Sequence, residues 1–484
     1  MGGFSVADVK DGLIVAVKKD CATCVMVDPV IGQLAEGPAK LMVFSQDDPE
    51  FPVSVTDVID DRELERSYRL NIDTVPTLIK VQGGREVARA VGWNRAAWES
   101  LSGEKGLGAD LPAHRPGCGA INAGPGMPER LAVKFGDAKF SSRVLTVPDY
   151  EDEIEACFDR EWTDGLPVVP PTRERVYRML QGTSRGPEEI VGVVPPDLVE
   201  CTVEKVAINA VMAGCKPEYL PVVLAAVEAA CMDEFCMHGL LATTWFSGPM
   251  VIVNGPIRRA IGMNWAGNCL GQGNRANATI GRALQLIVRN VGGGKPQGID
   301  RATFGNPGKY TFCFAEDEDG SPWEPLSVER GVAPGKSAVT LFAADGVQGV
   351  FDQISRTPES LVRTFAACLR TTAHPKIALA SDAFVVVSPE HGRVFREAGW
   401  SKAKVKEEIG KLLMLPGAEM IRGAGGIAEG LPEHLKDVTI PKFRPGGLNI
   451  VHAGGAAGLF SAIISGCLAT GAMGSSPVTK EISQ

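Results

Sequence analysis

The chain has 484 residues, too many for one core of ordinary size, so two or three domains are expected. Its formal net charge of −9 argues against a nucleic-acid partner or an anionic membrane surface. No basic-then-apolar leader is present, and the longest apolar stretch, 220–231, is too short to span a bilayer; a cytoplasmic protein without a membrane partner, its cysteines mostly reduced, is therefore predicted.

The first 105 residues predict a small α/β unit. The expected elements are a strand at 13–17, a helix at 21–37, a strand at 40–44, a helix at 61–70, strands at 77–81 and 86–91, and a helix at 94–101. Gly83 and Gly84 separate the last two strands, and a glycine pair between apolar runs is typical of a hairpin turn.

Cys21 and Cys24 form a C-x-x-C motif at the junction of the first strand and helix. The helix amides favour the thiolate of Cys21, and Cys24 can then resolve a mixed disulfide by intramolecular attack. We therefore expect a redox-active disulfide between these residues, with Cys21 as the attacking thiol. The alternative is half of a zinc site, which requires a second Cys/His pair at ligand spacing that the sequence lacks.

The order of these elements, the C-x-x-C motif and the segment 74–77 (TVPT) resemble the thioredoxin-like superfamily over residues 1–105. The resemblance implies a thioredoxin-like domain in which Pro76 is a cis-proline held against the thiols. It also implies a cellular dithiol reductant as partner. The residues around the thiols read KDCATC in place of the usual WCGPC, which favours a dedicated electron donor over a general thioredoxin.

Residues 106–147 are rich in Gly and Pro and weakly periodic, so they predict a linker that packs in extended form. Cys118 lies in this linker within a Pro-Gly-Cys-Gly turn, where a thiol is more exposed than on an apolar face. It is one candidate for the thiol that Cys21 reduces. Cys215, at a predicted helix end, and Cys269, in a loop, are the others; the alternative for each is an inert cysteine.

Residues 148–484 predict a larger α/β domain. The expected strands are 250–253, 338–342, 383–387 and 448–452, and the expected helices are 203–215, 220–233, 279–291, 357–372 and 401–414. Their alternation predicts sheets covered on both faces. Gly and Pro cluster at 330–337, where the domain could divide into two subdomains.

Several stretches of this region resemble a poorly characterised bacterial family that is associated with small thiol or selenol redox proteins. The stretches are 163–172 (TDGLPVVPPT), 207–215, 275–282 and 475–480. The resemblance implies a redox setting for the larger domain but names no reaction.

A Gly/Asn-rich loop, 264–277, runs into a predicted helix. Glycines let backbone amides approach a ligand, and a helix start favours an anion such as a carboxylate or phosphate. The candidate substrate-binding residues are Asn209, Asn254, Asn264, Asn268, Arg275, Asn277 and Arg282. The alternative is a structural loop with asparagines at its turns, and no nucleotide-binding fingerprint is present.

Two other groups of polar residues carry less weight. Glu204 and Lys205 offer groups for acid–base chemistry, although most such charges are simply solvated. Cys236 and His238 have no second pair at ligand spacing, so no metal and no further cofactor are expected.

The sequence therefore predicts an enzyme, a thiol-dependent oxidoreductase. Its C-x-x-C domain would pass electrons to a cysteine of the C-terminal domain, which would reduce a small anionic substrate or cleave a carbon–heteroatom bond. One alternative is a hydrolase or lyase with a structural or regulatory thioredoxin-like appendage. Another is a non-catalytic binding or assembly protein, and whether the chain forms a homo-oligomer stays open.

Overall fold

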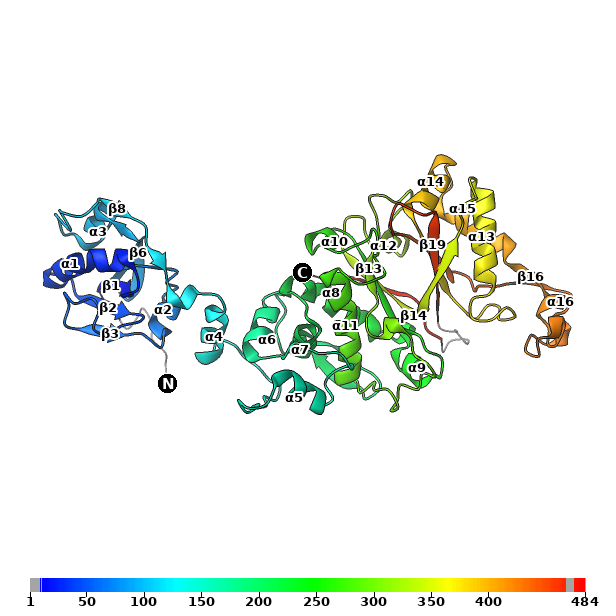
Figure 1. Cartoon of the computed structure of the whole chain (residues 1–484), viewed down its shortest axis with the longest axis horizontal. Coiled ribbons are helices and arrows are strands. Elements are labelled where there is room, and N and C mark those ends of the chain that lie inside the picture. Colours follow the sequence, from blue (N-terminus) through cyan, green and yellow to red (C-terminus); the bar gives the residue numbers. More distant parts are fainter. Residues whose placement is uncertain (1–8, 10, 467–473, 484) are drawn as a thin grey trace. The chain divides into compact units, whose positions relative to one another are not determined.

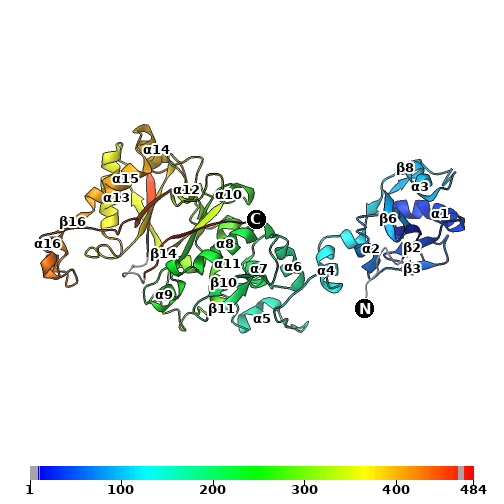
Figure 2. The same cartoon turned by 180° about the vertical axis from the view of Figure 1, so that it is seen from behind.

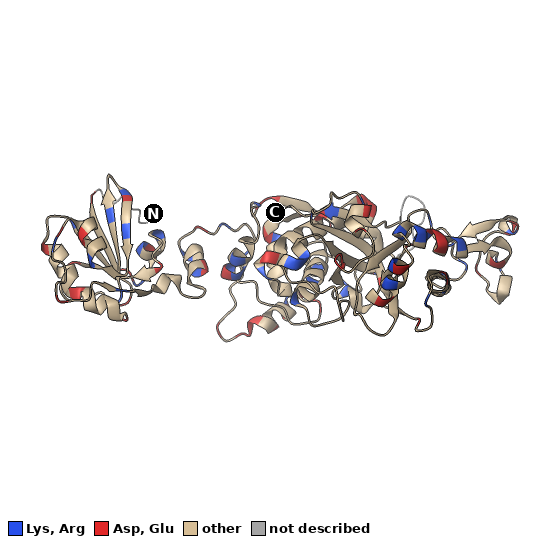
Figure 3. Ribbon diagram, turned by 90° about the horizontal axis from the view of Figure 1, so that it is seen from above, with Lys and Arg blue, Asp and Glu red and all other residues tan. Residues whose placement is uncertain are grey.

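The computed structural model describes residues 9, 11–466 and 474–483, and the chain forms two compact units, Met1–Lys139 and Phe140–Gln484 (Figure 1). Both units mix helices and sheets, so the chain is of the mixed α/β class that the sequence predicts. Acidic and basic residues are interspersed along the helices and strands of both units (Figure 3). Among the described residues, no helix is both long and apolar enough to cross a bilayer.

The first unit is built on a five-stranded sheet in the order β3-β2-β1-β5-β6. Its strands are β1 (Gly12–Val17), β2 (Leu41–Ser45), β3 (Val58–Asp60), β5 (Thr77–Gln82) and β6 (Arg85–Val91), and its main helices are α1 (Ala22–Glu36), α2 (Glu65–Arg69) and α3 (Arg95–Ser102). Strands β1, β2 and β3 are parallel, whereas β5 pairs antiparallel with both β1 and β6.

Most of the elements expected in this unit are present. Gly83 and Gly84 both have positive φ, 57° and 71°, as the tight turn between β5 and β6 requires. The helix expected at 61–70 is much shorter, because Leu64 takes a left-handed conformation and the buried Asp61 carboxylate accepts the amides of Arg66 and Ser67. Strand β3 was not expected, since three residues are too few to show an alternating pattern.

Residues 106–139 belong to the first unit rather than to a linker between domains. Two short strands carry this segment back onto the unit: β8 (His114–Arg115) pairs with β7 (Trp93–Asn94), and β9 (Cys118–Gly119) pairs with β4 (Thr74–Val75). Helix α4 (Met127–Lys134) follows, and Asp137 beyond it forms an ion pair with Arg69. The expected boundary at residue 105 was therefore too early, because only tertiary pairing holds these weakly periodic residues in place.

The second unit is built on a seven-stranded mixed sheet in the order β13-β12-β14-β19-β15-β18, with β20 paired to β14. Its strands are β12 (Gly248–Asn254), β13 (Cys313–Ala315), β14 (Ala338–Phe351), β15 (Ala383–Val387), β18 (Leu448–His452), β19 (Phe460–Gly466) and β20 (Val478–Glu481). Strand β14 has a register shift at Asp345 and pairs with β12 before it and with β19 after it. One sheet thus contains strands from both sides of the subdomain break expected at 330–337.

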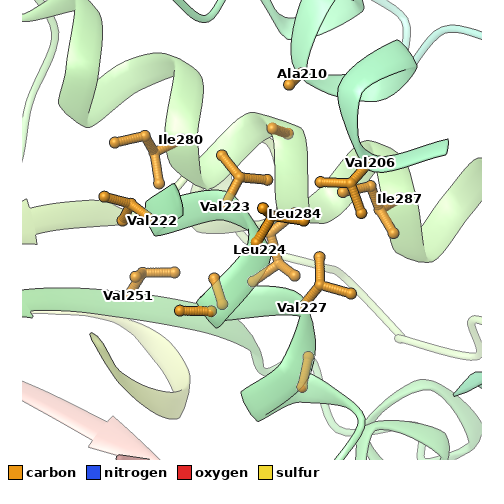
Figure 4. Close-up of a cluster of buried hydrophobic side chains, with 14 of the residues drawn as sticks. Val206, Ala210, Val222, Val223, Leu224, Val227, Val251, Ile280, Leu284 and Ile287 are labelled. Carbon is orange, nitrogen blue, oxygen red and sulfur yellow. The ribbon is translucent and has the colours of Figure 1, made fainter. Parts of the chain in front are cut away.

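Helices cover this sheet with separate cores. Helices α7 (Val203–Ala213), α8 (Leu220–Ala230) and α11 (Arg275–Asn290) pack on β12 through a cluster that includes Val251 (Figure 4). The neighbours Met250 and Ile252 point to the other face, where Phe342 and Phe384 meet edge-on at 4.8 Å. Helices α13 (Pro358–Arg370), α14 (Pro389–Glu397) and α15 (Lys402–Leu412) cover the part of the sheet that holds β15 and β18 (Figure 2).

Candidate functional site

The candidate active site lies at the amino terminus of α1. Cys21 is the N-cap residue of this helix, with extended backbone angles, and its Sγ accepts the amide of Cys24 at 3.3 Å. Both are free thiols; Cys21 is 3% exposed and Cys24 is fully buried. The helix amides therefore point at the sulfur that the C-x-x-C motif designates as the attacking thiol.

A third thiol, Cys118, belongs to the same site. Strand β9 pairs antiparallel with β4, and the pairing sets Cys118 opposite Val75, the residue before Pro76. The thiol of Cys21 can donate to the Val75 carbonyl at 3.4 Å, and the Thr23 hydroxyl donates to the Pro116 carbonyl at 2.7 Å. The peptide between Val75 and Pro76 is cis.

These contacts give the three thiols different pKa values. A hydrogen bond from the Cys24 thiol, helped by one from Cys118 and by the amides of Cys24 and Thr23, lowers the pKa of Cys21 to about 5. Burial, followed by the hydrogen bond to Cys21, raises the pKa of Cys24. The hydrogen bond to Cys21, followed by burial, raises the pKa of Cys118. Cys21 is therefore the thiolate of the cluster, and its two neighbours keep their protons.

The placement of Cys118 corrects the expectation drawn from the sequence. It was expected in a linker between the domains, as one candidate for the thiol that Cys21 reduces; it lies in the first unit, near Cys21, and the exchange with Cys21 stays a prediction. No local pattern could show this, because the contact depends on a two-residue strand pairing across more than forty residues of chain. The Pro-Gly-Cys-Gly turn was the available signal; it predicted an exposed thiol and a candidate partner for Cys21, but not the strand pairing.

The Gly/Asn-rich loop of the second unit uses its asparagines to hold itself together. Asn277 is 3% exposed; its side chain accepts the amide of Asn264 and donates to the carbonyls of Asn264 and Cys269. The side chain of Asn268 donates to the carbonyl of Gln272 within the same loop. These amides are therefore engaged by the protein's own backbone.

Both arginines expected to clamp a ligand are also engaged. Arg282 forms a two-pronged ion pair with Asp164, with both distances at 2.8 Å, and donates to the carbonyls of Leu166 and Pro167. Arg275 donates to the carbonyl of Gly214, which ends α7. Arg282 thus gives the TDGLPVVPPT segment its anchor on α11.

Asn209 and Asn254, the other expected binding residues, have partners as well. Asn209 accepts from Asn290 and donates to the Lys205 carbonyl. Asn254 ends β12 and donates to Glu316 and Glu318. Its buried side-chain oxygen has no hydrogen-bond partner.

Cys215 and Cys269 are both inside the second unit. Burial raises the pKa of Cys215 to about 12 and that of Cys269 to about 11. Cys215 packs in the core of α7, α8 and α11, and Cys269 packs on the opposite face of β12. These two thiols are held protonated and are covered in the folded unit.

A cavity of about 710 Å³ opens in the second unit between residues 140–147 and helices α5 (Glu153–Asp159), α6 (Arg173–Leu180) and α7. Its size is that of a small-molecule site. The cationic lining residues are Arg143, Arg160, Arg173 and Lys205, and the acidic ones are Glu153, Glu174 and Glu204. Much of the remaining wall is apolar, and Asn209 is the one expected binding residue that lines it.

Two further features of the cavity are the TDGLPVVPPT segment and a cysteine in its wall. Pro170, Pro171 and Thr172 line it, so the TDGLPVVPPT segment runs from its anchor on Arg282 to the cavity wall. Cys157 also lines it, a thiol that the sequence analysis did not single out. The Glu204 carboxylate accepts the amides of Ser141 and Ser142, and it thereby holds the lining segment 140–147 against the cavity.

A buried polar pair lies at the ends of β13 and β18. His452 is fully buried, and its Nδ1 lies 3.1 Å from an Asp317 carboxylate oxygen. Burial lowers the pKa of His452, which opposes the effect of this carboxylate. The ring thus packs as a buried histidine that faces Asp317 through Nδ1, while its Nε2 has no hydrogen-bond partner.

Among the residues that the structure describes, no cluster of three or more His, Cys, Asp or Glu side chains could hold a metal ion. Comparison with protein-family models, with curated proteins and with solved structures found no match to this chain.

Proposed function

We propose that the chain is a thiol–disulfide oxidoreductase whose first unit is a thioredoxin-like domain. The observation that carries the proposal is the Cys21 sulfur, which caps α1, accepts the Cys24 amide at 3.3 Å and has a pKa lowered to about 5. At neutral pH this sulfur is a thiolate with a second thiol one helical turn away. That is the arrangement needed for attack on a disulfide followed by resolution.

The reaction proceeds in two exchanges. The Cys21 thiolate attacks one sulfur of a substrate disulfide, and the other sulfur leaves as a thiolate and takes up a proton. Cys24 then loses its proton to solvent and attacks the Cys21 sulfur, which releases the reduced substrate and leaves a disulfide between Cys21 and Cys24. Two electrons have passed to the substrate, and a cellular dithiol returns the site to its starting state by the reverse exchanges.

This function is tested with the reduced full chain and bis(2-hydroxyethyl) disulfide, with no other reductant present. The wild type is expected to deliver two electrons per chain and to end with a disulfide between Cys21 and Cys24. Cys21→Ser should lose the reaction, and the double variant Cys24→Ser/Cys118→Ser, which keeps no neighbouring thiol to resolve it, should stop at a mixed disulfide on Cys21. Cys368→Ser is the matched control, because Cys368 is a partly exposed thiol of the second unit. Unchanged electron delivery in Cys21→Ser would overturn the proposal.

For the second unit we propose a binding site for a small anionic substrate in the 710 Å³ cavity. Arg160 pairs with Glu151 and Lys205 donates to the Glu200 carbonyl, so Arg143 and Arg173 are the cationic side chains that, with the apolar wall, support a ligand with a negative group and an apolar body. The asparagines of the Gly/Asn-rich loop are engaged, as are Arg275 and, on α11, Arg282, which makes that loop the weaker candidate. Cys157 is the thiol at the cavity wall, but it is 3% exposed and burial raises its pKa, so it has no better claim to reactivity than Cys215 or Cys269 and the cavity is proposed for binding alone.

The cavity is tested with 8-anilinonaphthalene-1-sulfonate, an apolar anion, by titration calorimetry. Ile208 lines the cavity, and Ile208→Trp fills part of it, so binding is expected to weaken by about tenfold, or about 1.4 kcal/mol. Ile354→Trp, at a position that is 88% exposed and away from the cavity lining, is the control. Equal affinity of the wild type and Ile208→Trp for the probe would show that it binds outside this cavity and would contradict the proposed site.

A further inference from the structure

The first unit holds a thiol for which a two-cysteine mechanism has no use. Cys118 lies next to the attacking sulfur, close enough that each thiol shifts the proton affinity of the other. Cys24 is also within electrostatic reach of Cys118, but the hydrogen bond of Cys118 is to Cys21. The strand pairing sets Cys118 opposite Val75, whose carbonyl oxygen lies 3.4 Å from the Cys21 sulfur, so a disulfide between Cys21 and Cys118 joins neighbouring thiols.

The chain places Cys118 there by strand pairing. Strand β9 occupies the edge of β4, as an extended peptide does when it adds a strand to an open edge. A Cβ on Gly117 would lie 2.4 Å from Thr74 Cγ2 and 2.6 Å from the Val75 oxygen, so only glycine permits this approach. The Thr23 hydroxyl fixes the same segment from the side of α1 through the Pro116 carbonyl.

The three sulfurs also differ in their access to solvent. Cys21 and Cys24 are buried, at 3% and 0% exposure, whereas Cys118 is partly exposed. A thiol on a large partner would meet Cys118 before it could reach the other two. The exposed sulfur is thus the one through which a protein-sized partner can exchange.

We propose that Cys118 is a third redox thiol. It attacks the Cys21 sulfur of the Cys21–Cys24 disulfide, so that the disulfide then joins Cys21 to the partly exposed Cys118. We call this step the relay. The proposal rests on the proposed function, since it starts from the Cys21–Cys24 disulfide. Segment 114–119, which carries Cys118, then exchanges with Cys21 in the way that a bound substrate segment would. The partner it serves is a protein thiol or disulfide, because a small disulfide does not require an exposed relay.

The exchange is balanced without any further oxidant or reductant. The Cys118 thiol loses its proton and attacks the Cys21 sulfur of the Cys21–Cys24 disulfide. The Cys21–Cys24 bond breaks, the Cys21–Cys118 bond forms, and Cys24 leaves as a thiolate that takes up a proton. One disulfide is consumed and one is formed, so the oxidation state of the unit is unchanged.

The relay is tested by mapping disulfides in the full chain after oxidation with one equivalent of diamide, acid quenching and alkylation. Trypsin does not cleave between Arg115 and Pro116, so Cys118 lies in the peptide 106–130, while Cys21 and Cys24 share the peptide 20–40. A link between the two peptides therefore reports the relay. The wild type is expected to give this link together with the internal one, and Cys24→Ser to give the link between peptides alone.

The positioning by strand pairing is tested with two glycine variants. Gly117→Ala is expected to lower the yield of linked peptides by about tenfold while the Cys21–Cys24 disulfide persists, because the added methyl separates β9 from β4. Gly119→Ala, where an added Cβ meets nothing within 4 Å, should match the wild type.

The outcomes separate the two proposals. A wild type that forms the Cys21–Cys24 disulfide but no linked peptides overturns the relay and leaves the proposed function intact. If no Cys21–Cys24 disulfide forms and Cys21→Ser still reduces bis(2-hydroxyethyl) disulfide, the proposed function itself fails. Equal yields from Gly117→Ala and Gly119→Ala would overturn the role of the strand pairing.

Discussion

Cys21 is expected to react with iodoacetamide at a rate that rises with pH and reaches half its maximum near pH 5. Only the thiolate is alkylated, and the depressed pKa makes the thiolate the main form from just above pH 5. A thiol at the usual value of 9.0 would instead gain reactivity across that higher range. Mass spectrometry of peptide 20–40 after short exposures measures the rate, with Cys368 as the comparison thiol in the same sample.

Two variants identify the cause of this depressed pKa. Cys24→Ala removes the hydrogen bond that lowers the pKa of Cys21 most, so the midpoint should move upward. Cys118→Ala removes a smaller contribution and should move it upward by less. A wild-type midpoint near 9, or a larger shift in Cys118→Ala than in Cys24→Ala, would contradict this account of the site.

The same pKa makes the reduced protein's stability depend on pH. In the unfolded chain Cys21 keeps its proton up to about pH 9, whereas in the folded unit it has lost the proton above about pH 5. The free energy of unfolding should therefore rise with pH between 5 and 9. This contribution is fully present above pH 9 and is lost as the pH falls through 5.

Arg282→Ala is expected to lower the free energy of unfolding of the full chain by about 3 kcal/mol. The substitution leaves the Asp164 carboxylate, whose side chain is only 12% exposed, without its partner, and it removes the donor to the carbonyls of Leu166 and Pro167. Breaking a largely buried ion pair from one side is costly because the remaining charge stays desolvated. Denaturant titration followed by tryptophan fluorescence measures the loss.

Further variants separate this structural role from ligand binding. Arg282→Lys keeps the charge but not the two-pronged geometry, so an intermediate loss is expected. Arg393→Ala, at an exposed position on α14, should change the free energy of unfolding by no more than about 0.5 kcal/mol. If Arg282→Ala has the same free energy of unfolding as the wild type, the ion pair with Asp164 is not structural. The Arg282 side chain is then available to bind a ligand, as the sequence predicts.

Local patterns predicted the elements well where one face of a strand or helix is consistently apolar. The strand at 13–17, the hairpin around Gly83 and Gly84, and the helix now bounded as Val203–Ala213 all follow from periodicity and turn residues. Strands β13 and β20 were missed because they are only three and four residues long and owe their conformation to neighbouring strands.

The candidate site could be predicted only as far as contacts local in sequence define it. Cys21 and Cys24 are three residues apart, and the role of each follows from their order on a helix. Cys118 reaches them through a strand pairing with no sequence pattern, and Arg282 finds Asp164 across 118 positions. Asn277 illustrates the opposite error, since a residue type suited to binding a ligand binds its own loop instead.

Strand β14 has a consequence for how the second unit can be divided. It supplies hydrogen-bond partners to β12 and β20 along its first half and to β19 along its second half. The glycines and prolines at 330–337 predict a break between subdomains. If the gene were split there, the amino-terminal fragment would lack β14 and would expose the edge of β12 that β14 pairs with. Such fragments are expected to aggregate when made separately, so complementation in one cell, rather than independent expression, is the way to study the two parts of this sheet.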